Sequence, residues 1–318
     1  MARLLITRPL PASIVDAARA RHEVTLREAT TPLDESELDA ALRDFDAVIP
    51  TLGDSFSAQV FERVPHPRCR VLANFGVGYN HIDAAAARAA CVEVTNTPDT
   101  VTDATADTAM TLILMSARRA GEGERLVRAG QWTGWHPTQM LGLHVTGKTV
   151  GIVGMGRIGK AIARRCHHGF GMQVVFYNRS VVADPGVPAR QCERLHDVMA
   201  AADIVVIAVP GGVQTRHLID AKALAQMQPH ARLVNIARGD VVDEDALISA
   251  LEAGRIGGAG LDVYEQEPHV PERLRAMDNA VLLPHLGTAA LEVREAMGQM
   301  ALDNATAVLD GRTPPNPV

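Results

Sequence analysis

The sequence predicts an α/β protein made of two doubly wound parallel-sheet domains, and three observations indicate this fold class. Short β-rich runs alternate with helical patterns along the whole chain, which is typical of parallel sheets. The 318 residues suit two hydrophobic cores better than one. The third observation is a glycine motif, Gly154-x-Gly156-x-x-Gly159, in the middle of the chain between a β pattern and a helical pattern.

The β-rich runs fall into two series separated by helical, often alanine-rich segments. The first series is expected at residues 3–7, 23–26, 47–50 and 70–74. The second series is expected at residues 149–153, 173–177, 204–209, 232–236, 257–263 and 280–283. Each series predicts a parallel sheet of its own.

A long helical pattern, residues 102–129, lies between the two series. Thr100, Thr102 and Asp103 are candidates for its N-terminal cap. Residues 109–114 are apolar on nearly all sides, so this helix is expected to be buried between layers or against a second subunit.

A final helical pattern, residues 289–309, follows the last strand and ends before Gly311, Pro314 and Pro315. We expect this helix to pack back on the first domain. The glycine-motif domain, residues 99–288, is therefore expected to be inserted into a domain built from residues 1–98 and 289–318.

The composition excludes several classes of protein. It is 47% hydrophobic and 21% charged, close to the average of soluble globular chains. The net charge of -6, without a long run of Lys or Arg, argues against a nucleic-acid or membrane partner. The apolar runs are too short for a signal peptide or a membrane span. The four cysteines form no CxxC pair and are expected to be buried, reduced thiols. We expect a soluble, cytoplasmic protein without a bound metal.

Each glycine of the motif has a mechanical reason. Gly154 permits a tight turn, Gly156 lets a pyrophosphate approach the backbone, and Gly159 lets a helix lie close to the strand. The pyrophosphate is expected on the first amides of that helix, which include those of Arg157 and Ile158. The motif predicts a Rossmann-type dinucleotide domain; an ordinary glycine-rich turn is the alternative.

The end of the next strand selects between NAD and NADP, because a carboxylate there binds the ribose 2′-hydroxyl of NAD and repels the 2′-phosphate of NADP. In this chain the place is taken by Asn178-Arg179-Ser180. Arg179 can pair with a 2′-phosphate in a contact worth roughly 1.5 to 3 kcal/mol. NADP(H) is therefore predicted over NAD(H), and a solvated surface arginine is the alternative.

Three further segments place polar residues at the ends of late strands, where open α/β sheets bind ligands. These residues are Arg238, Glu267 and His285. A buried arginine, glutamate or histidine is costly unless it is paired or functional. Each also has a structural interpretation, as a surface ion pair, a carboxylate at a helix start and a core histidine respectively.

Together with the glycine loop, these segments closely resemble the D-isomer-specific 2-hydroxyacid dehydrogenase family over essentially the whole chain. The resemblance implies that Arg238 binds the substrate carboxylate and helps to orient the carbonyl. It implies that His285 is the general acid for reduction and the base for oxidation. Glu267 would accept a hydrogen bond from the other ring nitrogen and favour the imidazolium.

The resemblance also implies the surrounding contacts. Val77 and Gly78 match the backbone amides that bind the substrate carboxylate, in a flavodoxin-like substrate domain. Thr108 would face the cofactor, and Asp262 would bind the nicotinamide amide. Cofactor-contacting positions near the other strand ends are Val209, Pro210, Thr215, Ala237, His285 and Gly287.

Within the family the sequence looks most like the glyoxylate and hydroxypyruvate reductases, for example at Asn96-Thr-Pro98 and at the segment from Trp132 to Trp135. The expected reaction is reduction of a small 2-keto acid to the D-2-hydroxy acid by NADPH, in a homodimer. The alternatives are an NAD(H)-dependent dehydrogenase of a larger 2-hydroxy acid and a non-catalytic, nucleotide-sensing protein similar to a corepressor. A formate or phosphite dehydrogenase, which shares the nucleotide domain, is a further alternative. Glu267 argues against the formate type, in which this position resembles an uncharged amide.

Overall fold

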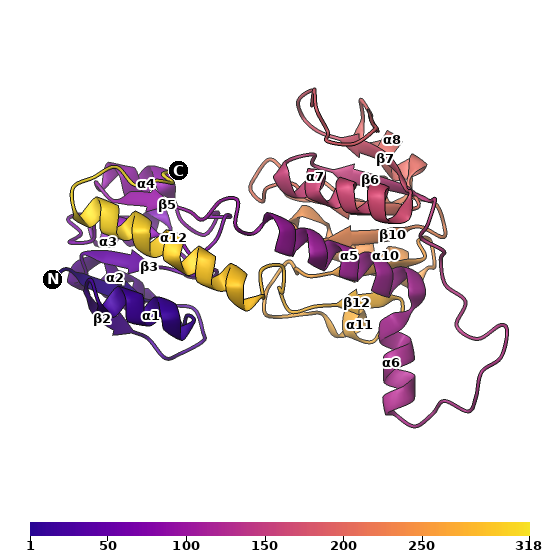
Figure 1. Cartoon of the computed structure of the whole chain (residues 1–318), viewed down its shortest axis with the longest axis horizontal. Helices are drawn as coiled ribbons and strands as arrows, with labels where there is room; N and C mark the ends of the chain where they lie inside the picture. Colours follow the sequence, from indigo (N-terminus) through magenta and orange to yellow (C-terminus); the bar gives the residue numbers. More distant parts are fainter. The chain divides into compact units, whose positions relative to one another are not determined.

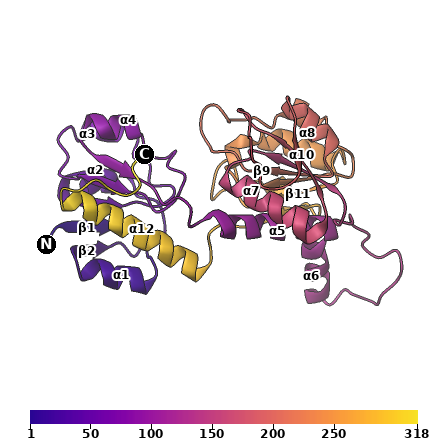
Figure 2. The same ribbon diagram turned by 45° about the horizontal axis from the view of Figure 1, so that its top comes forward.

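The computed structural model describes residues 1–318, and the chain divides into two compact units. Unit 1 joins Met1–Val101 to Thr288–Val318, and unit 2 is the continuous segment Thr102–Gly287. Each unit has one parallel sheet with helices packed against it (Figures 1 and 2) and its own hydrophobic core. The predicted fold class is confirmed.

The sheet of unit 1 has five parallel strands in the order β2-β1-β3-β4-β5. This is the order of flavodoxin-like doubly wound folds. The strands are β1 (Arg3–Ile6), β2 (Glu23–Leu26), β3 (Ala47–Ile49), β4 (Val71–Ala73) and β5 (Glu93–Thr95). The sequence pattern did not indicate β5, which gains part of its pairing from the C-terminus, where Val318 N–H donates to Val94 O.

Five helices complete unit 1. They are α1 (Ala12–Arg19), α2 (Glu35–Asp44), α3 (Ala58–Arg63), α4 (Ala84–Ala89) and α12 (Leu291–Leu309). Helix α12 packs beside α1 and against β3 and β4, as expected for the final helix (Figure 1). The close approach depends on Gly298, where a Cβ atom would lie 2.8 Å from Cγ1 of Ile14. Ser13 and Glu295 hydrogen-bond across the same two helices at 2.6 Å.

The sheet of unit 2 has seven parallel strands in the order β12-β11-β10-β9-β6-β7-β8. The chain reverses its winding direction between β6 and β9, and such a switch point is where doubly wound sheets bind ligands. The strands are β6 (Thr149–Val153), β7 (Gln173–Tyr177), β8 (Ala189–Gln191), β9 (Ile204–Ile207), β10 (Arg232–Asn235), β11 (Gly258–Leu261) and β12 (Ala280–Leu282). The edge strand β8 was not predicted, because it is short and polar.

Helices α5 and α7 pack against each other, α5 also against β10 and β11, and α7 against β6. Helix α8 contacts β6 and β7, and α9 contacts α10. The helices of unit 2 are α5 (Thr102–Arg118), α6 (Ala120–Arg128), α7 (Arg157–Arg164), α8 (Leu195–Ala201), α9 (Ala221–Leu224), α10 (Glu244–Glu252) and α11 (Glu272–Arg275), with a π turn at Arg165–Gly169 and a 3-10 turn at Gly239–Val241.

The single long helix expected over residues 102–129 is wrong. Arg119 has a left-handed backbone (φ 53°) and separates α5 from α6. The last carbonyl groups of α5 accept hydrogen bonds from outside the helix, Ala117 O from Leu143 N–H and Ser116 O from Arg232 Nε, which ends the helix there. Helix α6 has no buried residue and stands away from the sheet of its unit in Figure 1.

Two smaller expectations were tested by burial. Leu114 of α5 is 36% exposed, so this helix is not covered on all sides. Three of the four cysteines are buried, and burial raises the pKa of the Cys69 and Cys166 thiols to about 12. The expectation is wrong for Cys91, which lies exposed in the turn after α4. None of the helices combines the length and apolar character needed to cross a membrane.

Candidate active site

The predicted site residues of unit 2 come together because they follow strands of one parallel sheet at its carboxyl edge. The side chains therefore cluster by topology, although they are far apart in the sequence. Gly154 follows β6, Asn178 follows β7, Val209 and Pro210 follow β9, Ala237 and Arg238 follow β10, Asp262 follows β11, and His285 follows β12.

His285 and Glu267 form the central contact of this edge. Nδ1 of His285 lies 2.8 Å from Oε2 of Glu267, and the two side chains are 31% and 29% exposed. Because a carboxylate only accepts, Nδ1 is the donor, and Nε2 is the ring nitrogen that can exchange a proton with a ligand. Burial alone would raise the pKa of Glu267, but the hydrogen bond and charge of His285 outweigh it and hold the pKa below its ordinary value.

Asp262 fixes the backbone on both sides of this histidine. Its carboxylate is 1% exposed and accepts the N–H groups of Leu286 and Gly287 at 2.6 and 2.8 Å. His285 has a left-handed backbone (φ 56°), and its own N–H donates to Asp262 O at 2.9 Å. A non-glycine residue keeps such a conformation only where its surroundings enforce it. Burial raises the pKa of the Asp262 carboxyl, although the two backbone N–H groups act against that rise.

Arg238 follows β10 and is half-buried. One terminal guanidinium nitrogen donates to Ala237 O at 2.7 Å. Burial lowers its pKa, while the carboxylates of Glu267 and Asp240 act in the opposite direction. The side chain lies over Gly211, where a Cβ atom would be 2.6 Å from Cγ of Arg238. The absence of a side chain at Gly211 therefore makes room for this arginine.

The glycine loop fits a pyrophosphate group. Gly154 has φ 100°, and a Cβ atom there would lie 2.7 Å from Ala208 O. A Cβ atom at Gly159 would lie 2.1 Å from Gly154 O, so only glycine lets α7 lie this close to β6. Gly156 is the N-cap of α7 without a side-chain cap, and the space where its Cβ would stand is open. The first amides of α7, at Arg157, Ile158 and Gly159, can therefore receive an anion.

The end of β7, where the sequence predicts the choice between NAD and NADP, is followed by the amide of Asn178 and by Arg179, and not by a carboxylate. Asn178 Oδ1 accepts the N–H of Met155 in the glycine loop at 3.2 Å, and Asn178 Nδ2 donates to Ser180 O at 3.0 Å. Arg179 is exposed and donates to Oε1 of Gln214, a neutral amide, at 2.7 Å.

Other predicted residues shape the loops around this edge. Thr215 donates from Oγ1 to Pro210 O at 2.7 Å and so closes the loop after β9. The hydroxyl of Thr108 donates to Ala104 O within its own helix, whereas the buried Thr105 reaches Gly287 O at 3.3 Å. Thr105 was not predicted; the only signal for it was its place one helical turn before Thr108.

Val77 and Gly78 lie in unit 1, in the loop after β4. The loop is held from inside: Asn74 Nδ2 donates to Gly76 O and Gly78 O at 2.9 and 3.1 Å, and Asn96 Nδ2 donates to Val77 O at 2.9 Å. These side-chain amides take the carbonyl groups of the loop, which is an arrangement suited to presenting N–H groups to a carboxylate.

The sequence reasoning missed several residues that position the cluster. Asn235 is 1% exposed and spans the turn before Arg238, because its Nδ2 donates to Arg238 O and its Oδ1 accepts the N–H of Ala237. Tyr264 N–H donates to Oε1 of Glu267 at 3.1 Å. The only signal for Gly211 was the Gly-Gly pair after Pro210.

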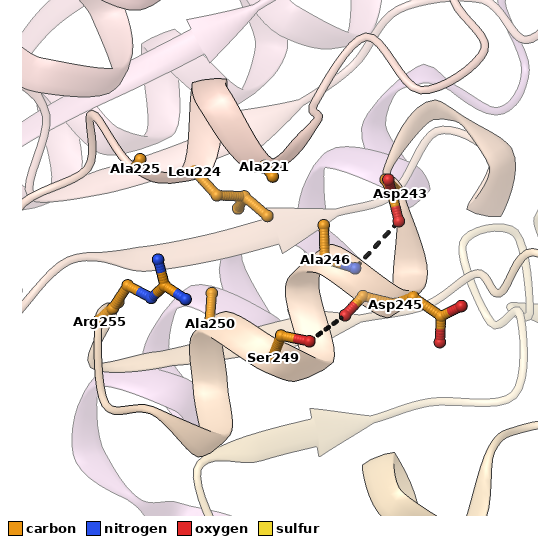
Figure 3. Close-up of a pocket in the computed structure, with 9 residues that line it drawn as sticks. All are labelled: Ala221, Leu224, Ala225, Asp243, Asp245, Ala246, Ser249, Ala250 and Arg255. Carbon is orange, nitrogen blue, oxygen red and sulfur yellow. Dashed lines mark hydrogen bonds between the residues drawn. The ribbon is translucent and has the colours of Figure 1, made fainter.

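A shallow groove of about 280 Å³ between α9 and α10 is not part of this cluster. Its floor is mostly alanine and leucine (Figure 3). Two hydrogen bonds drawn there belong to the helix itself: Asp243 accepts the N–H of Ala246 as the N-cap of α10, and Ser249 donates to Asp245 O.

The chain is similar to a known protein family and to known enzymes. Residues 110–287 match the family model of the D-isomer specific 2-hydroxyacid dehydrogenase, NAD binding domain. The glyoxylate reductase of Pyrococcus furiosus is 42% identical, and the match covers 98% of this chain and 94% of that protein. The glyoxylate reductase of Korarchaeum cryptofilum is 40% identical, with coverages of 99% and 95%.

Two solved structures are also similar to this chain. A protein from Thermus thermophilus superimposes with a TM-score of 0.92 at 41% identity, over 99% of both chains. An NADPH-dependent glyoxylate/hydroxypyruvate reductase from Sinorhizobium meliloti, in complex with NADP and malonate, gives a TM-score of 0.88 at 34% identity, over 100% of this chain and 96% of that one.

Proposed function

This chain belongs to the D-isomer-specific 2-hydroxyacid dehydrogenase family, and on that premise we propose that it reduces glyoxylate or hydroxypyruvate to the D-2-hydroxy acid with NADPH. The observation that carries the proposal is the 2.8 Å contact of His285 with Glu267, at the same sheet edge as Arg238 and the glycine loop. The glyoxylate reductases among the relatives support the choice of substrate.

His285 is the proton donor in this proposal. Glu267 holds the proton on Nδ1 and favours the charged ring, so Nε2 can protonate the carbonyl oxygen of the keto acid. Bound NADPH supplies the hydride to the carbonyl carbon. Asp262 keeps His285 in place through the flanking backbone.

Arg238 binds the substrate carboxylate, and its planar fork suits a bidentate contact. The amides of Val77 and Gly78 give unit 1 a substrate-binding role, and unit 2 is the cofactor domain. In unit 2 the positions proposed to contact the cofactor are Thr108, Gly154, Gly156, Arg157, Ile158, Gly159, Asn178, Arg179, Ser180, Val209, Pro210, Thr215, Ala237, Asp262, His285 and Gly287.

A preference for NADP(H) is proposed from Asn178 and Arg179. Asn178 brings no negative charge to the place of the 2′-phosphate, and Arg179 is tied to a neutral amide, so its charge is available to that phosphate. R179A should lower kcat/KM for NADPH by roughly tenfold to a hundredfold and leave that for NADH almost unchanged.

N178D is the converse change, because Asp keeps the acceptor for Met155 N–H but adds a carboxylate. It should favour NADH. Equal cofactor efficiency in the wild type, or a preference for NADH, would contradict the cofactor proposal but leave the keto-acid reaction standing.

The reaction itself is tested by following NADPH consumption with a panel of 2-keto acids. We expect turnover with glyoxylate or hydroxypyruvate, and a loss of at least about a hundredfold in kcat for H285A. Absence of turnover with every keto acid in the panel would refute the proposed function.

A homodimer is part of the proposal. Helix α6 and the segment after it expose large apolar side chains that a second copy could cover, including Val127 (59% exposed), Trp135 (76%) and Leu141 (68%). Light scattering tests this, and a monomer at micromolar concentration would refute it.

A further inference from the structure

Another cavity, with charged side chains in its wall, lies in unit 2. It is at the amino ends of the strands, the opposite end from His285. Its volume is about 290 Å³, and its walls come from the end of α5, from α6 and from the starts of β10, β11 and β12. Three arginines line the cavity: Arg119, Arg125 and Arg232. The acids that line it are Glu122 and Asp278.

Both acids are already paired. Arg119 and Glu122 form an ion pair at 2.6 Å, and Arg125 and Asp278 form another at 2.6 Å. One positive charge, that of Arg232, is therefore left over in the cavity.

Arg232 is 9% exposed. Its guanidinium donates to Ser116 O at 3.2 Å and to His230 O at 2.7 Å, but it forms no ion pair with a carboxylate. Burial and the nearby positive charge of Arg119 both lower its pKa. Both carbonyl groups satisfy N–H donors, and that of Ser116 adds partial negative charge from the end of α5, but neither brings a full negative charge.

The backbone is shaped around this side chain. A Cβ atom at Gly257 would lie 1.7 Å from a terminal nitrogen of Arg232, and a Cβ atom at Gly258 would lie 3.3 Å from its Cδ. Buried charges in proteins are normally paired, because an isolated one is costly. Arg232 is thus a buried cation that packs against two glycines, beside a second cation and a cavity. These are the features of an anion site.

We propose that this cavity binds a small oxyanion, the phosphate or carboxylate group of a free metabolite, with Arg232 as the buried anchor and Arg119 at the rim. The planar donors of a guanidinium match two oxygens of such a group. The site is separate from the sheet edge that carries His285, and the inference does not depend on the proposed reaction. Leu141 in its lining also belongs to the surface that the proposed homodimer covers, so the oligomeric state is measured alongside.

The test measures the melting temperature of the full chain, saturated with NADPH, in inorganic phosphate and in sodium chloride of equal ionic strength. The wild type should gain roughly 3 °C more than R232M when phosphate is about tenfold above its Kd. The comparison with R232M is needed because phosphate also stabilises proteins by exclusion from their surface and can enter the cofactor and keto-acid sites, which this variant retains.

R255M is the matched control, since it removes an exposed arginine elsewhere in the same unit and should respond as the wild type does. Without phosphate, R232M should melt close to the wild type, because the loss of an uncompensated buried charge offsets the loss of the hydrogen bonds to Ser116 O and His230 O.

Equal phosphate responses in the wild type and R232M would overturn the proposal. So would a change of oligomeric state in R232M without any phosphate response in the wild type, because Arg232 would then serve a contact between copies. If R232M does not fold, R119M replaces it, and an unchanged phosphate response in that variant would count against the site.

Discussion

At the scale of single residues, the chemistry of the site depends on how neighbours constrain His285. Glu267 sets the tautomer and favours the charge of the ring, while Asp262 sets the backbone. Two carboxylates thus act on one histidine in different ways. Glu267 acts through charge, whereas Asp262 acts through geometry.

Glu267→Gln separates charge from geometry. Gln can still accept from Nδ1 but carries no charge to stabilise the protonated ring that the proposed reaction uses as proton donor. The kcat for keto-acid reduction at neutral pH should therefore fall at least about tenfold. Glu265→Gln is the control, because Glu265 pairs with Arg216 and His217 instead. An unchanged kcat in Glu267→Gln would show that the charge of Glu267 does not assist the proton transfer.

Gly211→Ala tests whether the space left by Gly211 positions the side chain of Arg238. The new Cβ atom would lie 2.6 Å from Cγ of Arg238 and must displace that side chain. The KM for the keto acid should rise at least about tenfold, equivalent to about 1.4 kcal/mol, with little change in the KM for NADPH. Val213→Ala, at a side chain 96% exposed in the same loop, should leave both KM values unchanged. Normal keto-acid kinetics in Gly211→Ala would disprove this positioning role.

At the scale of elements, glycine decides which helices can approach their neighbours. Gly159 brings α7 against β6, Gly260 lets α5 lie on β11, and Gly298 brings α12 against α1. Helix α6 differs, because a Cβ atom added at Gly121 or Gly123 would lie no closer than 3.5 Å to any neighbour. In α6 glycine only weakens the helix.

Gly298→Ala and Gly123→Ala should therefore change stability in opposite directions. In α12 the added methyl group would meet the stiff, β-branched Ile14 at 2.8 Å, and we expect a net loss of about 1 to 2 kcal/mol. In α6 the same substitution should gain up to about 1 kcal/mol from helix propensity. Urea unfolding of both variants measures the difference. Stabilisation by Gly298→Ala would mean that α1 yields easily, and adding Ile14→Val should then have no further effect.

At the scale of the whole molecule, one unit is a single segment inserted into the other, and each has its own core. Carboxylates distributed over both units are held in their charged form by hydrogen bonds and cations. Groups whose pKa is lowered are Asp34, Glu37, Asp46, Asp197, Asp203, Glu252 and Glu267. The opposite shift, a raised pKa, occurs at Glu244 and Asp262.

Acid should therefore destabilise the chain. A carboxyl group with a lowered pKa stabilises the fold above its ordinary value of 3.8 (Asp) or 4.5 (Glu), and this contribution is lost as pH falls through the folded-state pKa. The two carboxyl groups with a raised pKa act in the opposite direction, but they are fewer than the seven with a lowered pKa. The free energy of unfolding, measured in urea, should fall steadily below about pH 4.5. Constant stability from pH 6 to pH 3 would contradict this balance.

The sequence by itself determined the fold class, the glycine loop and the order of the polar strand ends. These signals are local: a strand followed by a helix implies a parallel sheet, and parallel strands carry Arg238, Glu267 and His285 to one edge wherever they stand in the chain. It also led to the prediction that Arg179 selects NADP(H), because that role belongs to a fixed position after the strand that became β7.

Only the tertiary structure decided what depends on partners distant in the sequence. The break at Arg119 depends on Leu143 and Arg232 reaching the end of α5, and β5 depends on the C-terminus. The conformation of His285 depends on Asp262, and the place of Arg238 depends on Gly211. In each case the deciding contact joins segments that lie apart in the sequence. Hydrogen bonds and close packing form in space and leave no periodicity in the sequence, so the local pattern does not reveal such contacts.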